Sequence, residues 1–307
     1  MTYDRFADLN GVRICYRQDG QLDAPAIFLI AGLGMQVIEW PEDLIAGLAE
    51  RFRVIRMDNR DSGLSDRLGG TFTAVPDGFS WDGSPCEIAP YDLGDMAGDV
   101  VALADHLGIA TFDCLGFSMG GMIAQRIAIR APERLRLLVS LSSTGGSGAL
   151  SATPQSRQMM ERFFLPFDTS VDAENAIRES NAHFSSGLMT RDSAANGDLA
   201  RALVARAVDG GGYLRQALAI TGTPDWETDL SGAAVPALFV HGDNDPCITP
   251  DAARRLAARM PNATFRALPD LGHWVDDRVV EMCLNWLTKP KKTPQGAPYA
   301  TPEPDLN

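Results

Sequence analysis

The sequence predicts an α/β protein in which a mostly parallel central sheet is flanked by helices and interrupted by a helical insertion. Short apolar runs, typical of strands buried on both faces, alternate with helical segments along most of the chain. This alternation stops between Gly145 and about Ser231, where the composition stays helical without a convincing strand, and it resumes afterwards. The sequence therefore predicts one α/β core built from two stretches of chain.

The chain opens with a predicted hairpin, because residues 5–8 and 12–17 flank Asn10 and Gly11, a pair that suits the positive φ angles of a tight turn. Residues 26–30 form a continuous apolar run that predicts a buried strand. Residues 58–90, rich in Gly, Pro, Asp and Ser, predict a long irregular stretch. The other elements expected in this half are a helix over residues 40–51 and a strand over residues 53–57.

The next predicted element is an amphipathic helix over residues 93–107, with Met96, Val100 and Leu103 at spacings of three and four. Further strands are expected over residues 112–115, 135–141, 235–240 and 264–268, and further helices over residues 119–130, 251–260 and 277–287. We expect the core to comprise residues 1–144 and 232–288, with the helical insertion at residues 145–231. Residues 289–307 contain five prolines and three lysines, which predicts a loosely held tail.

The balance of charge and the cysteine usage limit the partners. The 307 residues include 27 basic and 40 acidic ones, for a formal charge of −13. Such a surface repels phosphate backbones and anionic lipid, so we expect neither nucleic acid nor a membrane as partner. The five cysteines are widely spaced and form no C-x-x-C, which favours a reducing cytoplasm over a disulfide framework or a zinc site. The start of the chain lacks the apolar segment of a signal peptide, and the sequence leaves the oligomeric state open.

Ser118 is the candidate nucleophile, because residues 116–120 read G-F-S-M-G between a predicted buried strand and a predicted helix. A nucleophile on such a turn has a strained backbone, and glycines two positions away on either side allow the surrounding backbone to pack closely. The following helix directs its N-terminus towards the site, where it favours developing negative charge. The alternative is a glycine-rich turn with an incidental serine.

A serine nucleophile of this kind requires a histidine base, and the chain has four histidines. His273 lies in a loop after the last predicted strand, where parallel-sheet enzymes gather their active sites, and it is the candidate base. His106 is late in a helix, where a cationic residue is ordinary. His183 lies in the insertion without an evident acidic partner, and His241, at the end of a strand, is expected to organise its turn.

The acid that orients the base is expected in the loop at residues 241–246, which contains Asp243 and Asp245. Pro246 biases Asp245 towards an extended conformation. Asp243 is better placed to bond local backbone N–H groups, as aspartates in turns usually do. We therefore favour Asp245 as the acid and keep Asp243 as the alternative.

Together these residues resemble the α/β-hydrolase superfamily over residues 12–287, including the family's chain order of serine, acid and histidine. Residues 31–34, A-G-L-G, match the family's first oxyanion loop, usually written H-G-x-x. The resemblance implies that the backbone N–H groups of Leu33 and Met119 form the oxyanion hole. Ala31 replaces the frequent histidine, which leaves the hole intact because the donor is a backbone group.

Two more segments carry the resemblance. Residues 58–65, D-N-R-D-S-G-L-S, are similar to the loop after the family's fourth strand, in a variant of a bacterial subgroup that includes aclacinomycin methylesterase. Asp61 takes the place of a glycine there, and Arg60 is interpreted as joining loops rather than as catalytic. The insertion matches the position of the family's helical cap. Its large apolar residues could line an acyl site, although packing within the cap is the simpler interpretation for most of them: Met159, Met160, Phe163, Phe164 and Phe167.

The predicted function is a serine carboxylesterase that hydrolyses neutral, mainly apolar, small-molecule esters without a metal or cofactor. Ser118 also argues against the dehalogenases and epoxide hydrolases of this fold, which use an aspartate nucleophile. The alternatives are a methyl esterase acting on a larger ring system, a C–C bond hydrolase and a cofactor-free perhydrolase with the same three residues. A non-catalytic ligand receptor on a hydrolase fold is the alternative of another class.

Overall fold

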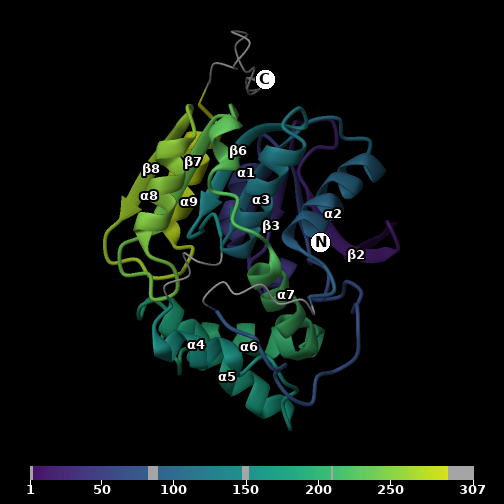
Figure 1. The fold of residues 1–307 in the computed structure, drawn as a ribbon, viewed down its shortest axis with the longest axis vertical. Helices are drawn as coiled ribbons and strands as arrows, with labels where there is room; N and C mark the ends of the chain where they lie inside the picture. The colour runs from purple at the N-terminus through teal and green to yellow at the C-terminus, as the bar shows by residue number, and fades with distance from the viewer. Residues whose placement is uncertain (1–2, 82–88, 147–151, 209, 290–307) are drawn as a thin grey trace.

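The computed structural model describes residues 3–81, 89–146, 152–208 and 210–289, and in this part of the chain eight strands form one sheet (Figure 1). The strand order is β1-β2-β4-β3-β5-β6-β7-β8. β1 and β2 pair antiparallel with their neighbours, whereas β4, β3 and the strands beyond them are parallel to one another. In chain order the strands are Arg5–Leu9, Val12–Asp19, Ala26–Ile30, Arg53–Met57, Phe112–Phe117, Leu135–Leu141, Ala237–Gly242 and Ala263–Leu268. The mostly parallel α/β sheet is therefore confirmed.

Helices cover both faces of this sheet and bury two apolar clusters against it. α2 (Leu93–His106), α3 (Met119–Arg130) and α8 (Pro250–Arg259) pack on one face. α1 (Glu42–Ala49) and α9 (Asp277–Leu287) pack on the other. The carboxyl ends of the parallel strands consequently meet at one edge of the layered core, where the loops after β5, β7 and β8 come together.

The helical insertion lies between β6 and β7 and contains no strand in the residues that the structure describes. It comprises α4 (Pro154–Glu161), α5 (Ser170–Phe184), α6 (Ala194–Arg206), α7 (Gly210–Gly222) and the short η3 (Asp229–Gly232). Figure 1 shows α4, α5 and α6 grouped below the sheet, with α7 running between them and the core. We use the name helical insert for α4–α7. Hydroxyl groups of Thr153, Thr169 and Ser193 accept N–H groups at the starts of α4, α5 and α6, which is why those helices begin there.

Buried ion pairs join the helical insert to the core. Arg206 of α6 lies 2.6 Å from a carboxylate oxygen of Asp58, and Arg215 of α7 lies 2.8 Å from Asp61. Asp61 has a φ of 68°, the left-handed region that favours glycine, which accounts for a glycine being usual at this position. Arg60 forms a two-pronged pair with Asp99 of α2, at 2.6 and 2.7 Å, so it joins two parts of the core as expected.

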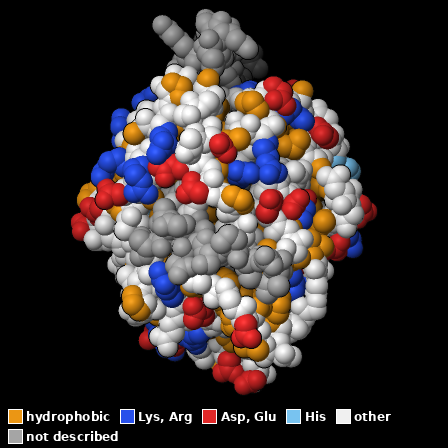
Figure 2. Space-filling view, in the orientation of Figure 1, with side chains coloured by type: hydrophobic (Ala, Val, Ile, Leu, Met, Phe, Trp, Pro, Cys, Tyr) orange, Lys and Arg blue, Asp and Glu red, His pale blue; other side chains and the backbone are white. Residues whose placement is uncertain are grey.

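The surface mixes both signs of charge. On the face shown in Figure 2, acidic and basic side chains are interspersed above the helical insert. No helix among the described residues is long and apolar enough to cross a membrane. Cys15, Cys114, Cys247 and Cys283 are buried and free, whereas Cys86 lies outside the described residues. The predicted tail also lies outside them, apart from Lys289.

Candidate active site

Ser118 sits at the turn between β5 and α3 with a φ of 54°, in a conformation that few residues other than glycine adopt. Close backbone packing surrounds this turn. A Cβ atom on Gly120 would lie 1.8 Å from the carbonyl oxygen of Ile30, and one on Gly116 would lie 2.2 Å from the carbonyl oxygen of Gly120. Both distances are far below contact, so the strand, the turn and the helix approach each other only because glycines stand at these positions.

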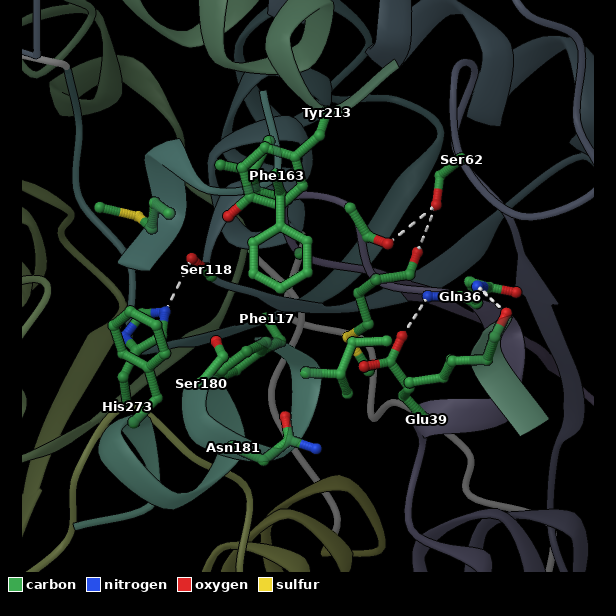
Figure 3. Close-up of a pocket in the computed structure, with 18 of the residues that line it drawn as sticks. Gln36, Glu39, Ser62, Phe117, Ser118, Phe163, Ser180, Asn181, Tyr213 and His273 are labelled. Atoms are coloured by element: carbon green, nitrogen blue, oxygen red, sulfur yellow. Dashed lines mark hydrogen bonds between the residues drawn. The ribbon is translucent and has the colours of Figure 1, made fainter. Parts of the chain in front are cut away.

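The structure brings Ser118, His273 and Asp245 together from the loops after β5, β8 and β7. His273 Nε2 lies 2.9 Å from Ser118 Oγ, and His273 Nδ1 lies 2.7 Å from Asp245 Oδ2. Figure 3 shows the contact between His273 and Ser118 at one end of a cavity. This hydrogen-bonded chain can transfer the hydroxyl proton of Ser118 to the imidazole while the carboxylate stabilises the imidazolium that forms.

Asp245 is held by four hydrogen bonds. Its Oδ1 accepts the N–H groups of Cys247 at 2.8 Å and Ile248 at 2.9 Å. Its Oδ2 accepts from His273 and, at 3.1 Å, from His241. Burial by itself would raise the pKa of this carboxyl, but the charge of His273 and the hydrogen bonds from both histidines outweigh it and hold the pKa of Asp245 well below its usual range. The carboxylate is therefore ionised at neutral pH.

The other candidate residues lie elsewhere. Asp243 accepts the N–H of Asp270 at 2.7 Å, so it joins the loops after β7 and β8 rather than bonding only the local N–H groups expected from the sequence. His241 is fully buried and also contacts the carbonyl oxygen of Ile248 at 2.8 Å, so it organises the turn as predicted. Its additional contact with Asp245 was not predicted. His183 contacts Ser156 within the helical insert, and His106 is exposed at the end of α2.

Leu33 and Met119 border the reacting group. A Cβ atom on Gly32 would lie 3.4 Å from the Cβ atom of Ser118, so the loop after β3 passes directly beside the serine. The amide of Gly34 donates to Gln216 Oε1 at 2.8 Å, which anchors this loop to α7. Met119 is the first residue of α3, and an amide at this position has no acceptor within its own helix. Leu33 and Met119 therefore lie in the two segments that flank Ser118, and their role as the oxyanion hole stays a prediction.

The cavity beside Ser118 has a volume of about 440 Å³. The helical insert supplies much of its apolar lining, including Met160, Phe163, Phe184, Leu199 and Leu203. Of the five large apolar residues that the sequence singled out there, Met160 and Phe163 line the cavity. Phe164 is buried against Phe79 and Trp81, and neither Met159 nor Phe167 belongs to the described lining.

Sequence reasoning missed several polar residues of the cavity: Gln36, Glu39, Ser180, Asn181 and Tyr213. Glu39 ends the short helix η1 (Val37–Glu39), and Figure 3 shows it on the opposite side of the cavity from His273. No spacing rule singles out such residues, because only the packing of the helical insert on the core turns them towards a common space. The one available signal concerned Gln36 and Glu39, which follow the predicted oxyanion loop within five residues along the chain.

Comparisons with known proteins agree with the fold. A family model described as alpha/beta hydrolase fold matches residues 25–275. The chain is 26% identical over 257 residues to the 3-oxoadipate enol-lactonase 2 of Acinetobacter baylyi, covering 84% of this chain and 85% of that one. It is 25% identical over 272 residues to a rhodomycin D methylesterase of Streptomyces peucetius, covering 82% and 85%.

Solved structures share the fold at lower identity. The enol-lactonase of Burkholderia xenovorans superposes with a TM-score of 0.73 at 24% identity, covering 93% of this chain and all of that one. An esterase of Rhodococcus superposes with a TM-score of 0.71 at 20% identity, covering 94% and 98%. Both structures share the sheet and the flanking helices with this chain.

Proposed function

We propose that this chain, which belongs to the α/β-hydrolase fold family, is a serine carboxylesterase with Ser118 as nucleophile, His273 as general base and Asp245 as the acid. The observation that carries the proposal is the hydrogen-bonded chain from Asp245 through His273 to Ser118, with distances of 2.7 and 2.9 Å. A serine on a left-handed turn, in contact with an imidazole that a carboxylate orients, is typical of nucleophilic catalysis.

In the proposed mechanism, His273 Nε2 takes the Ser118 proton as Oγ attacks the ester carbonyl carbon. The amides of Leu33 and Met119 stabilise the oxyanion of the tetrahedral intermediate. His273 then protonates the departing alcohol, leaving an acyl group on Ser118. A water molecule, deprotonated by His273, attacks this acyl-enzyme, and collapse of the second intermediate releases the acid and restores Ser118.

The proposed substrates are small, neutral carboxylic esters whose surface is mainly apolar. The Met and Phe side chains that line the cavity support this choice, since they adapt to varied apolar groups. In this proposal the helical insert acts as a cap over the substrate. The similarity to an enol-lactonase and a methylesterase favours ester cleavage, so lactones and methyl esters of ring systems belong among the compounds to test. The buried free cysteines support a reducing, cytoplasmic setting.

A fluorophosphonate probe tests the nucleophile, and a panel of p-nitrophenyl esters tests the reaction. The probe should label wild-type protein at Ser118, and Ser118→Ala should lose labelling and lower kcat by roughly 10⁴-fold or more while staying folded. A Ser118→Ala variant that kept more than about a tenth of the wild-type rate would contradict the assignment. Absence of labelling in folded wild-type protein would instead favour the non-catalytic receptor.

The acyl series tests the pocket. Each methylene buried in the cavity should contribute up to about 0.8 kcal/mol, so kcat/KM should rise with acyl length until the cavity is full. Flat activity from acetyl to octanoyl esters would contradict an apolar acyl site. Rates on methyl esters and lactones test whether the enzyme prefers these substrates to other esters. Product analysis in mixtures that contain peroxide tests for perhydrolysis. A vinylogous diketone substrate provides the corresponding test of C–C bond cleavage.

A further inference from the structure

We propose that Glu39 forms a cation-binding subsite in the cavity, on the side away from His273, so that the enzyme accepts esters with a positively charged group remote from the scissile bond. This inference rests on the proposed function as an ester hydrolase and extends its substrates from wholly neutral esters to cationic ones. It concerns one carboxylate that the mechanism does not use.

The carboxylate of Glu39 has one oxygen engaged and one available. Oε2 accepts the backbone N–H of Gln36 at 2.6 Å, a contact that stabilises the turn at η1. Oε1 receives no hydrogen bond from the described part of the chain, and Glu39 lines the same cavity as Ser118 and His273. Figure 3 shows the carboxylate facing the interior of this cavity. A polar oxygen without a partner in a mainly apolar cavity is a position at which a ligand can supply the missing hydrogen bond or charge.

The other charged groups around Glu39 are already paired. Arg206 lies 2.6 Å from Asp58 and 3.3 Å from Asp4, and it also donates to the side chain of Gln36. Its positive charge is therefore shared between two carboxylates. The phenol of Tyr213, whose pKa burial raises further above its ordinary value, stays neutral at physiological pH.

The remaining charged side chains of the lining are engaged as well. Arg67 donates to the carbonyl oxygens of Gly63 and Ser65. Asp61 is paired with Arg215. Among the described residues that line the cavity, Glu39 is consequently the one carboxylate without a bonded guanidinium, so it is the group there with which an added positive charge can pair.

The surroundings also strengthen such an interaction. Burial raises the pKa of Glu39 to about 7, an effect that the Gln36 N–H and Arg206 reduce and Asp58 increases. A cation beside the carboxylate would favour its charged form, so binding must strengthen as the pH rises through about 7. Apolar walls such as Phe163 and Leu203 keep the effective dielectric low, which makes the attraction larger than at the surface.

The test compares esters that differ only in charge. One ester carries a terminal trimethylammonium group and its partner carries the isosteric tert-butyl group, on a series of linkers of increasing length. A third ester carries a terminal carboxylate. Binding is measured by calorimetry on Ser118→Ala, in which turnover does not interfere, and kcat/KM is measured on protein with Ser118 intact. Because both isosteric esters use the same catalytic residues, the ratio of their kcat/KM values cancels the pH dependence that those residues contribute.

At the best linker length the trimethylammonium ester should be preferred on the order of ten-fold or more at about pH 8.5, with the preference falling towards one at about pH 5.5. Glu39→Gln keeps an oxygen to accept the Gln36 N–H but has no charge, so the ratio of kcat/KM between the trimethylammonium and tert-butyl esters should fall to about one at every pH. Glu50→Gln, which removes an exposed carboxylate beyond the cavity, should behave as wild type.

Each contrary result has a distinct meaning. Equal binding of the isosteric pair by Ser118→Ala at every linker length would overturn the subsite, even if both esters were hydrolysed well. A preference for the cation that persisted in Glu39→Gln, or a preference for the carboxylate ester, would also overturn it. Selective binding of the cationic ester without any turnover would support the subsite and contradict ester hydrolysis.

Discussion

Individual residues at the turn around Ser118 are fixed by how closely the backbone packs. Gly120 has no space for a side chain, since a Cβ atom there would meet the backbone carbonyl of Ile30, which cannot rotate away as a side chain could. Gly98 offers a contrast within the same core. It is an exposed residue in the middle of α2, and a Cβ atom added to it would meet nothing within 4 Å.

These two glycines give opposite predictions for the same substitution. Gly120→Ala should lower the free energy of unfolding by roughly 3 kcal/mol or more, because backbone must move to relieve the overlap. Gly98→Ala should raise it by about 0.5–1 kcal/mol, because alanine has the higher helix propensity. Urea unfolding followed by circular dichroism measures both. A Gly120→Ala protein as stable as wild type would show that the backbone at the turn packs less closely than the 1.8 Å distance to the Ile30 carbonyl oxygen implies.

The two aspartates of the β7 loop differ in what they contact, so their amide variants should differ in phenotype. Asp245→Asn should remain folded but reduce kcat by about 10⁴-fold, because an amide N–H facing His273 Nδ1 favours the wrong tautomer. Asp243→Asn should retain activity and lose about 1 kcal/mol of stability, from the weakened bond to the Asp270 N–H. Steady-state kinetics and urea unfolding on both variants show which aspartate is the acid. An inactive Asp243→Asn beside an active Asp245→Asn would reverse the assignment.

At the scale of elements, the helical insert is held to the core by contacts between residues far apart in sequence. Arg215 of α7 and Asp61 of the β4 loop are separated by 154 positions. Tyr91 donates its hydroxyl to the same carboxylate at 2.8 Å, and the backbone of α7 reaches the loop so closely that a Cβ atom on Gly212 would lie 2.1 Å from the carbonyl oxygen of Asp61. α7 therefore holds the insert to the core, together with α6, whose Arg206 pairs with Asp58.

Replacing one partner of this buried pair should lower the free energy of unfolding strongly, whereas replacing both partners should lower it much less. Arg215→Met leaves Asp61 buried without its cation and should lower the free energy of unfolding by about 3–5 kcal/mol. Adding Asp61→Asn, which suits a left-handed φ, should recover a large part of that loss. Arg201→Met, at an exposed ion pair of α6, is the control and should cost less than about 1 kcal/mol. Additive effects of the two buried changes in a double-mutant cycle would argue against direct coupling.

Elements with strong local signals could be predicted from the sequence, and those defined by packing could not. α3 begins at Met119 and ends at Arg130 as predicted, because the glycine-rich turn and Pro132 mark its two ends. α1 begins at Glu42 rather than at residue 40, since Pro41 is extended, with a ψ of 130°. The strand expected from residue 235 begins at Ala237, after Pro236, which has no N–H to donate to a neighbouring strand.

The site divides in the same way. Ser118, His273 and Asp245 follow predicted strands, and the carboxyl ends of parallel strands meet at one edge of a sheet, so their meeting could be predicted. The partners of Glu39 and Arg215 depend on how the helical insert sits on the core. The sequence of the insert gives its helical character but not the direction in which each helix faces, and so the polar part of the cavity was not predicted.

For the molecule as a whole, stability should depend on pH through carboxyl groups whose pKa values change on folding. The pKa of Glu39 rises from an ordinary 4.5 to about 7 in the folded protein, so the folded state binds more protons than the unfolded state between those values. The free energy of unfolding must therefore fall as the pH rises through this window. Asp245, whose pKa is lowered, acts in the opposite direction: its contribution is present above its unfolded pKa, about 4, and is lost as the pH falls below it.

The contribution of Glu39 can be isolated by comparison with Glu39→Gln. The variant should be more stable than wild type by about 1–3 kcal/mol at about pH 8, where the buried carboxylate is charged, and similar to wild type at about pH 4. Thermal or urea unfolding at several pH values measures this difference, with Glu50→Gln as the control for the loss of one negative charge. A difference that did not change with pH would mean that Glu39 titrates alike in the folded and unfolded protein.

Because the cysteines are buried, their rates of reaction with a thiol reagent can measure how often the protein around them opens. Burial raises the pKa of the Cys114 and Cys247 thiols far above their ordinary value, so both should react slowly with a thiol reagent while the protein stays folded around them. Cys114 belongs to β5 in the middle of the sheet, whereas Cys247 lines the cavity beneath the helical insert. In a Cys86→Ser background, the labelling rate at Cys114 would follow global unfolding. Faster labelling at Cys247 would give the rate at which the reagent reaches the cavity without global unfolding.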